Sequence, residues 1–515
     1  MHDGVPLETM RRRSGWAGVA GVAVSLGLTE LFAGFSTSVP SAISAIGSVV
    51  VDNSPSWLKD FAIQAFGTAD KAVLAICIVG VALLIGWFVG KASVERPWPM
   101  IVAFVAAGLV GILAQLADGS GEPGPIVAST LIAMSAGLGT WYGLLALAQP
   151  REREAADGDP VDLGRRRFML GVASAGTVAV VTIAVGRARL RSRAEAQRAA
   201  LELPTPVESQ PDPTTANDFD LVGLTPIVVG NATFYRIDTA LVVPTIDPDE
   251  WRLRITGLVE REVELSYQDI ADMPQIERYI TLSCVSNEVG DRLVGNALWT
   301  GVPLRDILDM AGPLPGADQI VGRSVDAWTA GFPTELAYDG RDALLAIGMN
   351  REVLPASHGF PARLVVPGLY GYVSATKWLS EIELTTWEAF DGYWIPRNWS
   401  KEGPIKTQSR IDRPKPREDL SVGSYTAAGV AWAPTKGIAK VEVQLDGGAW
   451  QETELSTPLS GDAWVQWRID LELTDGDHEL LVRATDGTGF TQSPIEVPPA
   501  PNGAEGWHTV RFSAA

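Results

Sequence analysis

The sequence predicts a group of apolar membrane helices, then an α+β domain, then an all-β sandwich. Residues 14–186 consist mainly of Ala, Val, Leu, Ile and Gly, whereas charged residues return at ordinary globular spacing after Leu201. A chain of 515 residues is also too long for a single core. We therefore divide the chain into a membrane domain (1–195), a linker (196–217), an α+β domain (218–416) and a sandwich (417–515).

Five apolar stretches have close to the roughly 20 residues that a membrane-spanning helix needs. A sixth, residues 39–51, is too short to span and is typical of an interfacial or re-entrant segment. We expect a multi-pass protein of the cell membrane, in contact with membrane lipid. The five stretches are 14–36, 72–90, 100–116, 125–148 and 168–185.

The charges beside these stretches predict their orientation, because positive residues collect in the short cytoplasmic loops. The C-terminal region is then expected outside the cytoplasm, although the Arg residues after the fifth stretch lie on that outer side too. The positive loops hold Arg11, Arg12 and Arg13, then Lys91 and Arg96, then Arg151, Arg153, Arg165, Arg166 and Arg167. The opposite loops hold Asp52, Asp60, Asp70, Asp118 and Glu122, together with Lys59 and Lys71.

The run from Gly164 to Leu170 (GRRRFML) resembles a twin-arginine export signal placed inside the chain. The alternative is that its arginines only anchor the following helix on the cytoplasmic side. Export of an already folded domain is expected where a cofactor has to be inserted in the cytoplasm.

Composition and histidine positions exclude two classes of protein. The net charge of -20 and the pI of about 4.7 argue against binding of nucleic acid, which needs clustered Lys and Arg. The four histidines, His2, His358, His478 and His508, lie outside the apolar stretches, and no Cys-x-x-Cys-His motif occurs. The membrane part is therefore not expected to be a b- or c-type cytochrome.

The soluble part begins with an extended segment. Residues 201–217 (LELPTPVESQPDPTTAN) are rich in Pro, Ser and Thr and lack hydrophobic periodicity, which predicts a tether. From Trp251 to Ile270 the alternation predicts two strands joined by a turn and then a short helix. A further helix is expected from Pro303 to Gly312.

The chain has two cysteines, of which Cys77 lies in an apolar stretch. Cys284 is therefore the only thiol of the soluble part and has no disulfide partner there. The strand 279–282 leads directly to Cys284 at the start of a loop, where a thiol can hold a ligand on a rigid base. The alternative is a small buried apolar residue.

A third stretch, SHGFPARLVVPGLYGYVSATKWL, combines a strand at 364–366 with a Gly-rich loop. His358, Arg363 and Lys377 are donors suited to an anionic group. Each of them taken singly could also be an ordinary surface charge.

The chain from about residue 234 to 416 resembles the sulfite-oxidase family of molybdopterin-dependent oxidoreductases. Four motifs stand in the order of that family, which is far more specific than any one of them. The motifs are FYRIDT with Arg236, SCVSN with Cys284, HGFPARLVVPG with His358 and Arg363, and SATKWL with Lys377.

The resemblance implies a molybdenum-molybdopterin cofactor with one pyranopterin per chain. Cys284 would be the thiolate ligand of the metal and, with Arg236, a catalytic residue. The implied reaction is oxygen-atom transfer in either direction, with a separate electron-transfer partner. The residues implied to bind the cofactor are Tyr235, Arg236, Asp238, Thr239, Asp326, His358, Arg363, Ala375, Thr376 and Lys377.

The tail from Leu420 to Ala515 alternates in short segments such as AKVEVQLDGG and HELLVRATDG, with turns at Asp-Gly pairs. This pattern predicts an antiparallel sandwich. It is similar to the immunoglobulin-like dimerisation domain that follows the molybdenum domain in this family, which implies a homodimer.

The substrate is expected to be a small oxide or oxyanion. Sulfite oxidases surround their anion with arginines, including a pair just after the ligand cysteine, where this chain has Asn287, Glu288 and Val289. Arg236 remains, and Arg292 is near enough in sequence to substitute. Sulfite is therefore not favoured, and a neutral oxide such as a sulfoxide is equally consistent.

Two functions of other classes remain as alternatives. A membrane transporter with an outer domain needs ionisable residues within its helices, and almost none is present apart from Glu30. A surface binding protein that has lost or never had the cofactor would account for the sandwich, but not for the surroundings of Cys284, His358 and Lys377.

Overall fold

The structure, a computed structural model, describes residues 7–36, 38–54, 70–118, 121–147, 160–240 and 243–515. The chain forms two units, each treated by itself below: residues 1–197 with 239–247, and residues 198–238 with 248–515. Several loop charges used to predict orientation lie outside the described residues. They are Lys59, Asp60, Arg151 and Arg153.

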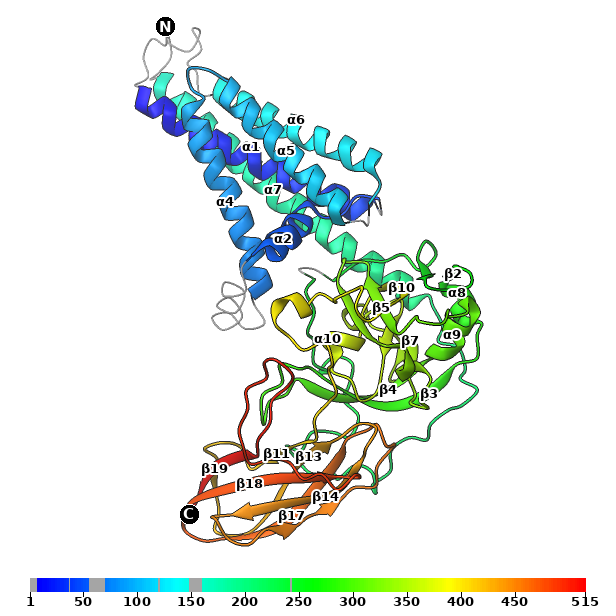
Figure 1. Ribbon diagram of the computed structural model, residues 1–515. Coiled ribbons are helices and arrows are strands. Elements are labelled where there is room, and N and C mark those ends of the chain that lie inside the picture. Colours follow the sequence, from blue (N-terminus) through cyan, green and yellow to red (C-terminus); the bar gives the residue numbers. More distant parts are fainter. Residues whose placement is uncertain (1–6, 37, 55–69, 119–120, 148–159, 241–242) are drawn as a thin grey trace. The chain divides into compact units, whose positions relative to one another are not determined.

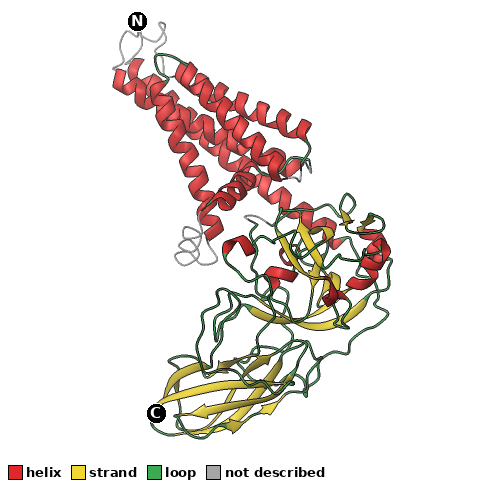
Figure 2. Ribbon diagram, in the orientation of Figure 1, coloured by secondary structure: helices red, strands yellow, loops and turns green. Residues whose placement is uncertain are grey.

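The first unit is helical (Figures 1 and 2). Within the described residues, five helices are long and apolar enough to cross a membrane: α1 (Leu7–Phe35), α4 (Asp70–Ala92), α5 (Trp98–Asp118), α6 (Pro123–Leu147) and α7 (Pro160–Ala199). The short stretch near residue 45 forms a separate helix, α2 (Ala42–Asn53). Helix α7 continues past the expected boundary at residue 195.

Helix α1 packs against its neighbours through glycines. A Cβ on Gly21 would lie 2.6 Å from the carbonyl oxygen of Gly137 in α6, and one on Gly34 would lie 2.5 Å from that of Gly186 in α7. Such contacts let helix backbones approach closely, which is how apolar helices gain packing energy when no hydrophobic effect separates them from lipid.

Glu30 is the buried carboxylate of this unit, with 1% of its surface exposed. Its Oε1 accepts a hydrogen bond from the Ser41 hydroxyl at 2.7 Å, and its Oε2 lies 3.6 Å from the guanidinium of Arg187. Arg187 is one of the arginines that contradicted the expected charge pattern, and the structure gives it a partner. Glu30 thus fixes the start of α2 and one turn of α7.

The second unit begins with two five-stranded sheets and short helices. One sheet has the order β3-β4-β7-β8, with β9 paired to β7, and the other has the order β2-β1-β10-β5-β6. The strands are β1 (Arg252–Gly257), β2 (Val263–Ser266), β3 (Ile276–Ser283), β4 (Val294–Pro303), β5 (Gln319–Ser324), β6 (Thr329–Pro333), β7 (Leu344–Met349), β8 (Glu352–Val353), β9 (Arg363–Val365) and β10 (Leu379–Thr385). The helices are α8 (Tyr267–Ala271), α9 (Leu304–Ala311), α10 (Gly371–Ser374), η3 (Thr334–Ala337), η4 (Ala356–His358) and η5 (Ile395–Arg397).

Local sequence explains several of these elements. The predicted pair of strands and short helix appear as β1, β2 and α8, whose start is capped by the Ser266 side chain accepting from the Asp269 amide. The predicted helix after Pro303 is α9, which buries its apolar face and ends at Gly312 in the left-handed conformation. These predictions of local structure are confirmed.

The segment 201–217 is not a free tether. The Val207 amide donates to the Gln275 carbonyl at 2.8 Å, the Glu277 amide donates to the Glu208 carbonyl at 2.8 Å, and the Tyr279 hydroxyl donates to the Pro211 carbonyl at 3.0 Å. This pairing was not predicted because a Pro-rich segment can pair along a strand edge without hydrophobic alternation.

The second unit ends in a β-sandwich. Its sheets have the orders β11-β13-β17-β16 and β12-β19-β18-β14-β15. Strand β11 lies before the expected boundary at 417, yet it is part of the sandwich. The strands are β11 (Gln408–Arg413), β12 (Asp419–Leu420), β13 (Gly423–Trp432), β14 (Ile438–Leu445), β15 (Gln451–Glu452), β16 (Glu454–Leu455), β17 (Val465–Leu473), β18 (Gly476–Asp486) and β19 (His508–Ala514).

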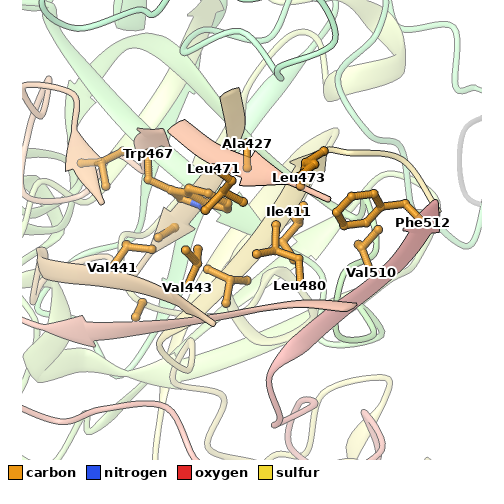
Figure 3. Close-up of a cluster of buried hydrophobic side chains, with 14 of the residues drawn as sticks. Ile411, Ala427, Val441, Val443, Trp467, Leu471, Leu473, Leu480, Val510 and Phe512 are labelled. Atoms are coloured by element: carbon orange, nitrogen blue, oxygen red, sulfur yellow. The ribbon is translucent and has the colours of Figure 1, made fainter. Parts of the chain in front are cut away.

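Both sheets of the sandwich contribute to one buried core. Trp467 and Leu471 extend from one sheet, and Val443, Leu480 and Phe512 extend from the other (Figure 3). Alternate residues of β18 are buried in this core, as the sequence pattern predicted.

Candidate functional site

Cys284 stands at the carboxyl end of β3, at the start of the loop 284–293. The loop is closed at its base, because the Cys284 amide donates to the Leu293 carbonyl at 2.8 Å and the Leu293 amide donates to the Asn287 side chain at 2.7 Å. Cys284 is buried, and burial raises the pKa of its thiol, while hydrogen bonds from Ser286 and the charge of Lys377 act in the opposite direction. A rigid strand therefore holds a buried thiol near a cation.

Asp238 joins two cations of the site. The Lys377 ammonium lies 3.2 Å from its Oδ2 and also donates to the Ser357 carbonyl, and the Arg236 Nε donates to the same Oδ2 at 2.7 Å. Burial lowers the pKa of Lys377 to about 8, and Asp238 limits the shift. Both predicted cations are thus held by a carboxylate that the sequence had placed in the same group.

Arg363 is buried without a carboxylate. Its guanidinium lies over the Trp299 ring at 5.0 Å and donates to the His358 carbonyl at 3.0 Å. Among the described residues no ion pair includes Arg363. Burial lowers the pKa of Arg363 to about 10, so its charge persists at neutral pH without a compensating anion. Such an arrangement is costly unless an anion binds there.

His358 is buried as well but supplies no charge. Its Nε2 lies 2.7 Å from the Asn231 carbonyl, and the Phe234 ring contacts its ring edge to face. Burial lowers its pKa to about 4, so the imidazole is neutral near pH 7. His358 was expected to be a donor to an anionic group; as a neutral imidazole it could only donate a hydrogen bond and would add no positive charge.

The segment 375–377 runs beside Arg363. The Ala375 carbonyl lies 3.5 Å from an Arg363 nitrogen, and the Leu364 amide donates to the Thr376 carbonyl. The Thr376 hydroxyl is buried and has no hydrogen-bond partner. An unsatisfied buried hydroxyl costs free energy that a bound polar group would recover.

Tyr235 and Asp326 complete the predicted group. Tyr235 stacks on Phe234 and lies close enough to Cys284 and Arg363 for both charges to affect its pKa, which burial raises. Burial also raises the pKa of Asp326, and the charge of Asp238 adds to the effect.

Thr239, also expected at the site, falls in the segment 239–247, which groups with the first unit. The structure therefore brings together the other predicted residues without placing Thr239 among them.

Tyr370 is a site residue that sequence reasoning missed. It is 3% exposed, and its hydroxyl accepts from the Lys406 amide at 3.4 Å. Burial, together with the charge of Cys284, raises the pKa of Tyr370 to about 12. The only signal in the sequence was an aromatic residue inside the Gly-rich loop, which periodicity does not distinguish from core packing.

The loop residues used for the substrate argument differ in exposure. Asn287 is buried and closes the loop, whereas Glu288 and Arg292 are exposed. Asn287 is therefore a structural residue here.

The donor set indicates what kind of group fits. Among the described residues no cluster of three or more His, Cys, Asp or Glu could hold a metal ion, so a metal at Cys284 would need ligands from a cofactor. The uncompensated Arg363, the Lys377 ammonium and the free Thr376 hydroxyl suit a phosphate-bearing organic group. The residues present thus fit a pterin cofactor whose sulfur ligands join the Cys284 thiolate.

Comparison with known proteins agrees with this arrangement. The family described as oxidoreductase molybdopterin binding domain matches residues 240–394, and the Mo-co oxidoreductase dimerisation domain matches residues 401–500. Human mitochondrial sulfite oxidase is 29% identical over 325 residues, covering 52% of this chain and 59% of that protein. The NADH nitrate reductase of Spinacia oleracea is 28% identical over 314 residues, covering 48% of this chain and 34% of that protein.

The chain spans about three fifths of the length of the sulfite oxidases it matches. Among solved structures, the sulfane dehydrogenase SoxCD from Paracoccus pantotrophus superposes with a TM-score of 0.49 at 23% identity, covering 55% of this chain and 80% of that one. The resemblance inferred from the four ordered motifs is confirmed: this chain belongs to the sulfite-oxidase family of molybdopterin-dependent oxidoreductases.

Proposed function

We propose that this protein catalyses oxygen-atom transfer at a molybdenum held by the Cys284 thiolate. The observation that carries the proposal is the buried guanidinium of Arg363, which lacks a carboxylate partner and lies in the same site as a buried thiol. When bound, the molybdenum cofactor supplies the two-electron chemistry of oxygen-atom transfer.

The chain's own residues hold and orient the cofactor in this proposal. Arg363 and Lys377 face its anionic part, and Asp238 keeps the Lys377 and Arg236 side chains in place at 3.2 and 2.7 Å. Tyr235 and Tyr370 keep their phenol protons near pH 7, so each is a neutral donor near Cys284. The proposed cofactor-binding set is Tyr235, Arg236, Asp238, Thr239, Asp326, His358, Arg363, Ala375, Thr376 and Lys377, with Cys284 and Arg236 catalytic.

A neutral oxide such as a sulfoxide is the substrate class that this pocket favours over sulfite. Arg236, the guanidinium matched to the family's substrate pocket, is already paired with Asp238. Glu288 lies on the loop beside Cys284 and adds a negative charge near an approaching anion.

The catalytic unit is proposed to lie outside the cytoplasm, attached to a multi-pass membrane domain. The support is the charge pattern of the loops together with the five apolar helices. Arg165 and Arg166, in the run that resembles an export signal, are exposed on α7. A reporter that is active only outside the cytoplasm should function when fused after Ala515 and fail when fused near Asp157.

The sandwich is proposed to be immunoglobulin-like and to form a homodimer, and electrons are proposed to pass to a separate carrier. The domain limits 1–195, 196–217, 218–416 and 417–515 are part of the same proposal. The match of residues 401–500 to a dimerisation domain supports the dimer.

Metal analysis of the purified full-length protein tests the central claim. We expect about one molybdenum per chain when the protein is made in a host that synthesises the cofactor. Pterin fluorescence after oxidation of the extracted cofactor provides a second measurement. Protein that circular dichroism shows to be folded, but that holds neither molybdenum nor pterin, would contradict the proposal. A binding or transport function would then be favoured.

A further inference from the structure

The strand that carries Cys284 has one edge paired with β4, and the sandwich contacts its other edge. The Thr281 amide donates to the Asp462 carbonyl at 2.9 Å, the Trp464 amide donates to the Thr281 hydroxyl at 2.8 Å, and the Ser460 hydroxyl donates to the Tyr279 carbonyl at 2.6 Å. The β16–β17 connection therefore covers the end of β3 nearest Cys284.

The loop 284–293 is contacted by two further parts of the sandwich. An Arg410 nitrogen donates to the Asp291 carbonyl at 2.9 Å. The His508 ring lies against Gly290 so closely that a Cβ there would be 2.2 Å from His508 Cδ2, and Gly290 has a φ of +83°. Because of this close contact and the positive φ, position 290 of the loop accommodates only a glycine.

His508 is itself held in place. Its Nδ1 accepts from the Ile411 amide at 2.9 Å, which fixes the ring orientation between β11 and β19. It is partly buried at the first residue of β19, and this hydrogen bond makes it a fixed support for the loop. The loop 284–293 thus rests on a side chain that belongs to the other domain of the second unit.

We propose that the sandwich positions the molybdenum ligand within its own chain, with His508 setting the place of the loop 284–293. The proposal rests on the proposed molybdenum site and adds to it a role for a domain whose family description names only dimerisation. His508 is a positioning residue: it touches the loop and not Cys284. Its removal should loosen the loop without unfolding the sandwich core.

The sandwich offers a matched control in His478. This histidine is buried, its Nδ1 lies 2.7 Å from Asp446 Oδ2, and its ring packs on Phe512. It lies on β18, outside the contacts with the loop 284–293. Replacing either histidine by Ala should lower the unfolding temperature, but only the His508 change should affect the loop.

The test measures the reactivity of the Cys284 thiol in full-length protein prepared without cofactor. Iodoacetamide labelling is followed by peptide mass spectrometry, which separates Cys284 from Cys77. We expect His508→Ala to speed Cys284 labelling by about five- to tenfold, because local opening of the loop becomes easier. His478→Ala should leave the rate unchanged. Equal rates in the two variants, whether raised or not, would overturn the proposal.

A second measurement uses Gly290→Ala, whose added methyl meets the His508 ring. Its effect on the Mo(V) electron paramagnetic resonance signal of the holoenzyme should be smaller in the His508→Ala background, since the clash is gone. If the effects of the two substitutions on the signal were additive, Gly290 and His508 would not be in direct contact.

If His508→Ala does not fold, His508→Gln replaces it in both measurements, because glutamine keeps an acceptor for the Ile411 amide. The labelling result stands without metal, so it separates failure of this proposal from failure of the molybdenum assignment.

Discussion

Glu30 in the helical unit and Arg363 in the second unit are both buried charges, but the chain supplies them with different partners. In the helical unit, the Glu30 carboxylate is surrounded by the Ser41 hydroxyl, the Ile43 amide and the Arg187 guanidinium. In the second unit, the Arg363 guanidinium is equally buried but meets only carbonyl oxygens and an aromatic ring. The comparison teaches that a buried charge with all partners supplied by the chain is structural, whereas one left short of a partner marks a place for a ligand.

The largest expected effect comes from the Cys284 thiol. Cys284→Ser should lower oxygen-atom transfer by roughly a thousandfold or more, because the hydroxyl does not replace the metal ligand. The serine has a similar volume, so the unfolding temperature should change little. Steady-state turnover and a thermal melt on the same sample measure both. Wild-type turnover by this variant would remove Cys284 from the site.

Charge removal tests the comparison itself. Arg363→Met should weaken cofactor retention by about ten- to a hundredfold, which corresponds to about 1.5 to 3 kcal/mol, while leaving the cofactor-free protein at least as stable as before. Glu30→Gln should do the reverse: it should destabilise the helical unit and leave cofactor content unchanged. Molybdenum content and thermal unfolding of both variants in detergent provide the measurements. Equal loss of stability in both would show that Arg363 is an ordinary structural residue.

A substrate comparison gives a smaller effect. Since Arg236 is paired with Asp238 and Glu288 is anionic, sulfite should be the poorer substrate by about tenfold or more in kcat/KM relative to a neutral sulfoxide. Sulfite oxidation and sulfoxide reduction would be assayed on one molybdenum-loaded preparation. Efficient sulfite turnover would show that Arg292 or another cation completes the anion pocket.

The smallest effect concerns His478 and His508 of the sandwich, which have opposite pH dependences. Hydrogen bonds to the Thr474 carbonyl and to Asp446 raise the pKa of His478, so its stabilisation is complete below about pH 6.5 and is lost as the pH rises through the higher folded-state pKa. Burial lowers the pKa of His508 to about 4, so stability falls as the pH drops from about 6.5 toward that value.

Chemical unfolding as a function of pH separates the two histidines. His478→Gln should remove the decline in stability on the alkaline side, and His508→Gln should remove the decline on the acidic side. The same slope in each variant as in the wild type would contradict both assignments.

Local pattern was sufficient for much of the fold. Alternation and a terminal glycine predicted β1, β2 and α9, and hydropathy predicted the five long helices. Helix α7 extends to Ala199 because its Arg-, Ala- and Gln-rich end has good helix propensity, although its hydropathy falls after residue 185. The order of the four motifs was enough to predict that Cys284, Arg363 and Lys377 belong to one site.

Long-range packing accounts for what the sequence did not predict. Tyr370, Arg410 and His508 reach the site only because separate segments fold together, and no periodicity marks them. The pairing of 207–211 with β3 also depends on an edge that exists only in the folded sheet.

The covering of β3 by residues 460–464 has a consequence for how the chain is made. In the order of synthesis these residues come long after β3, so the end of the strand that leads to Cys284 keeps an open edge while the intervening chain is made. Open edges of this kind recruit other chains. The α+β domain therefore depends on a segment that is synthesised much later for protection from aggregation, and a truncation before residue 460 should appear as insoluble protein.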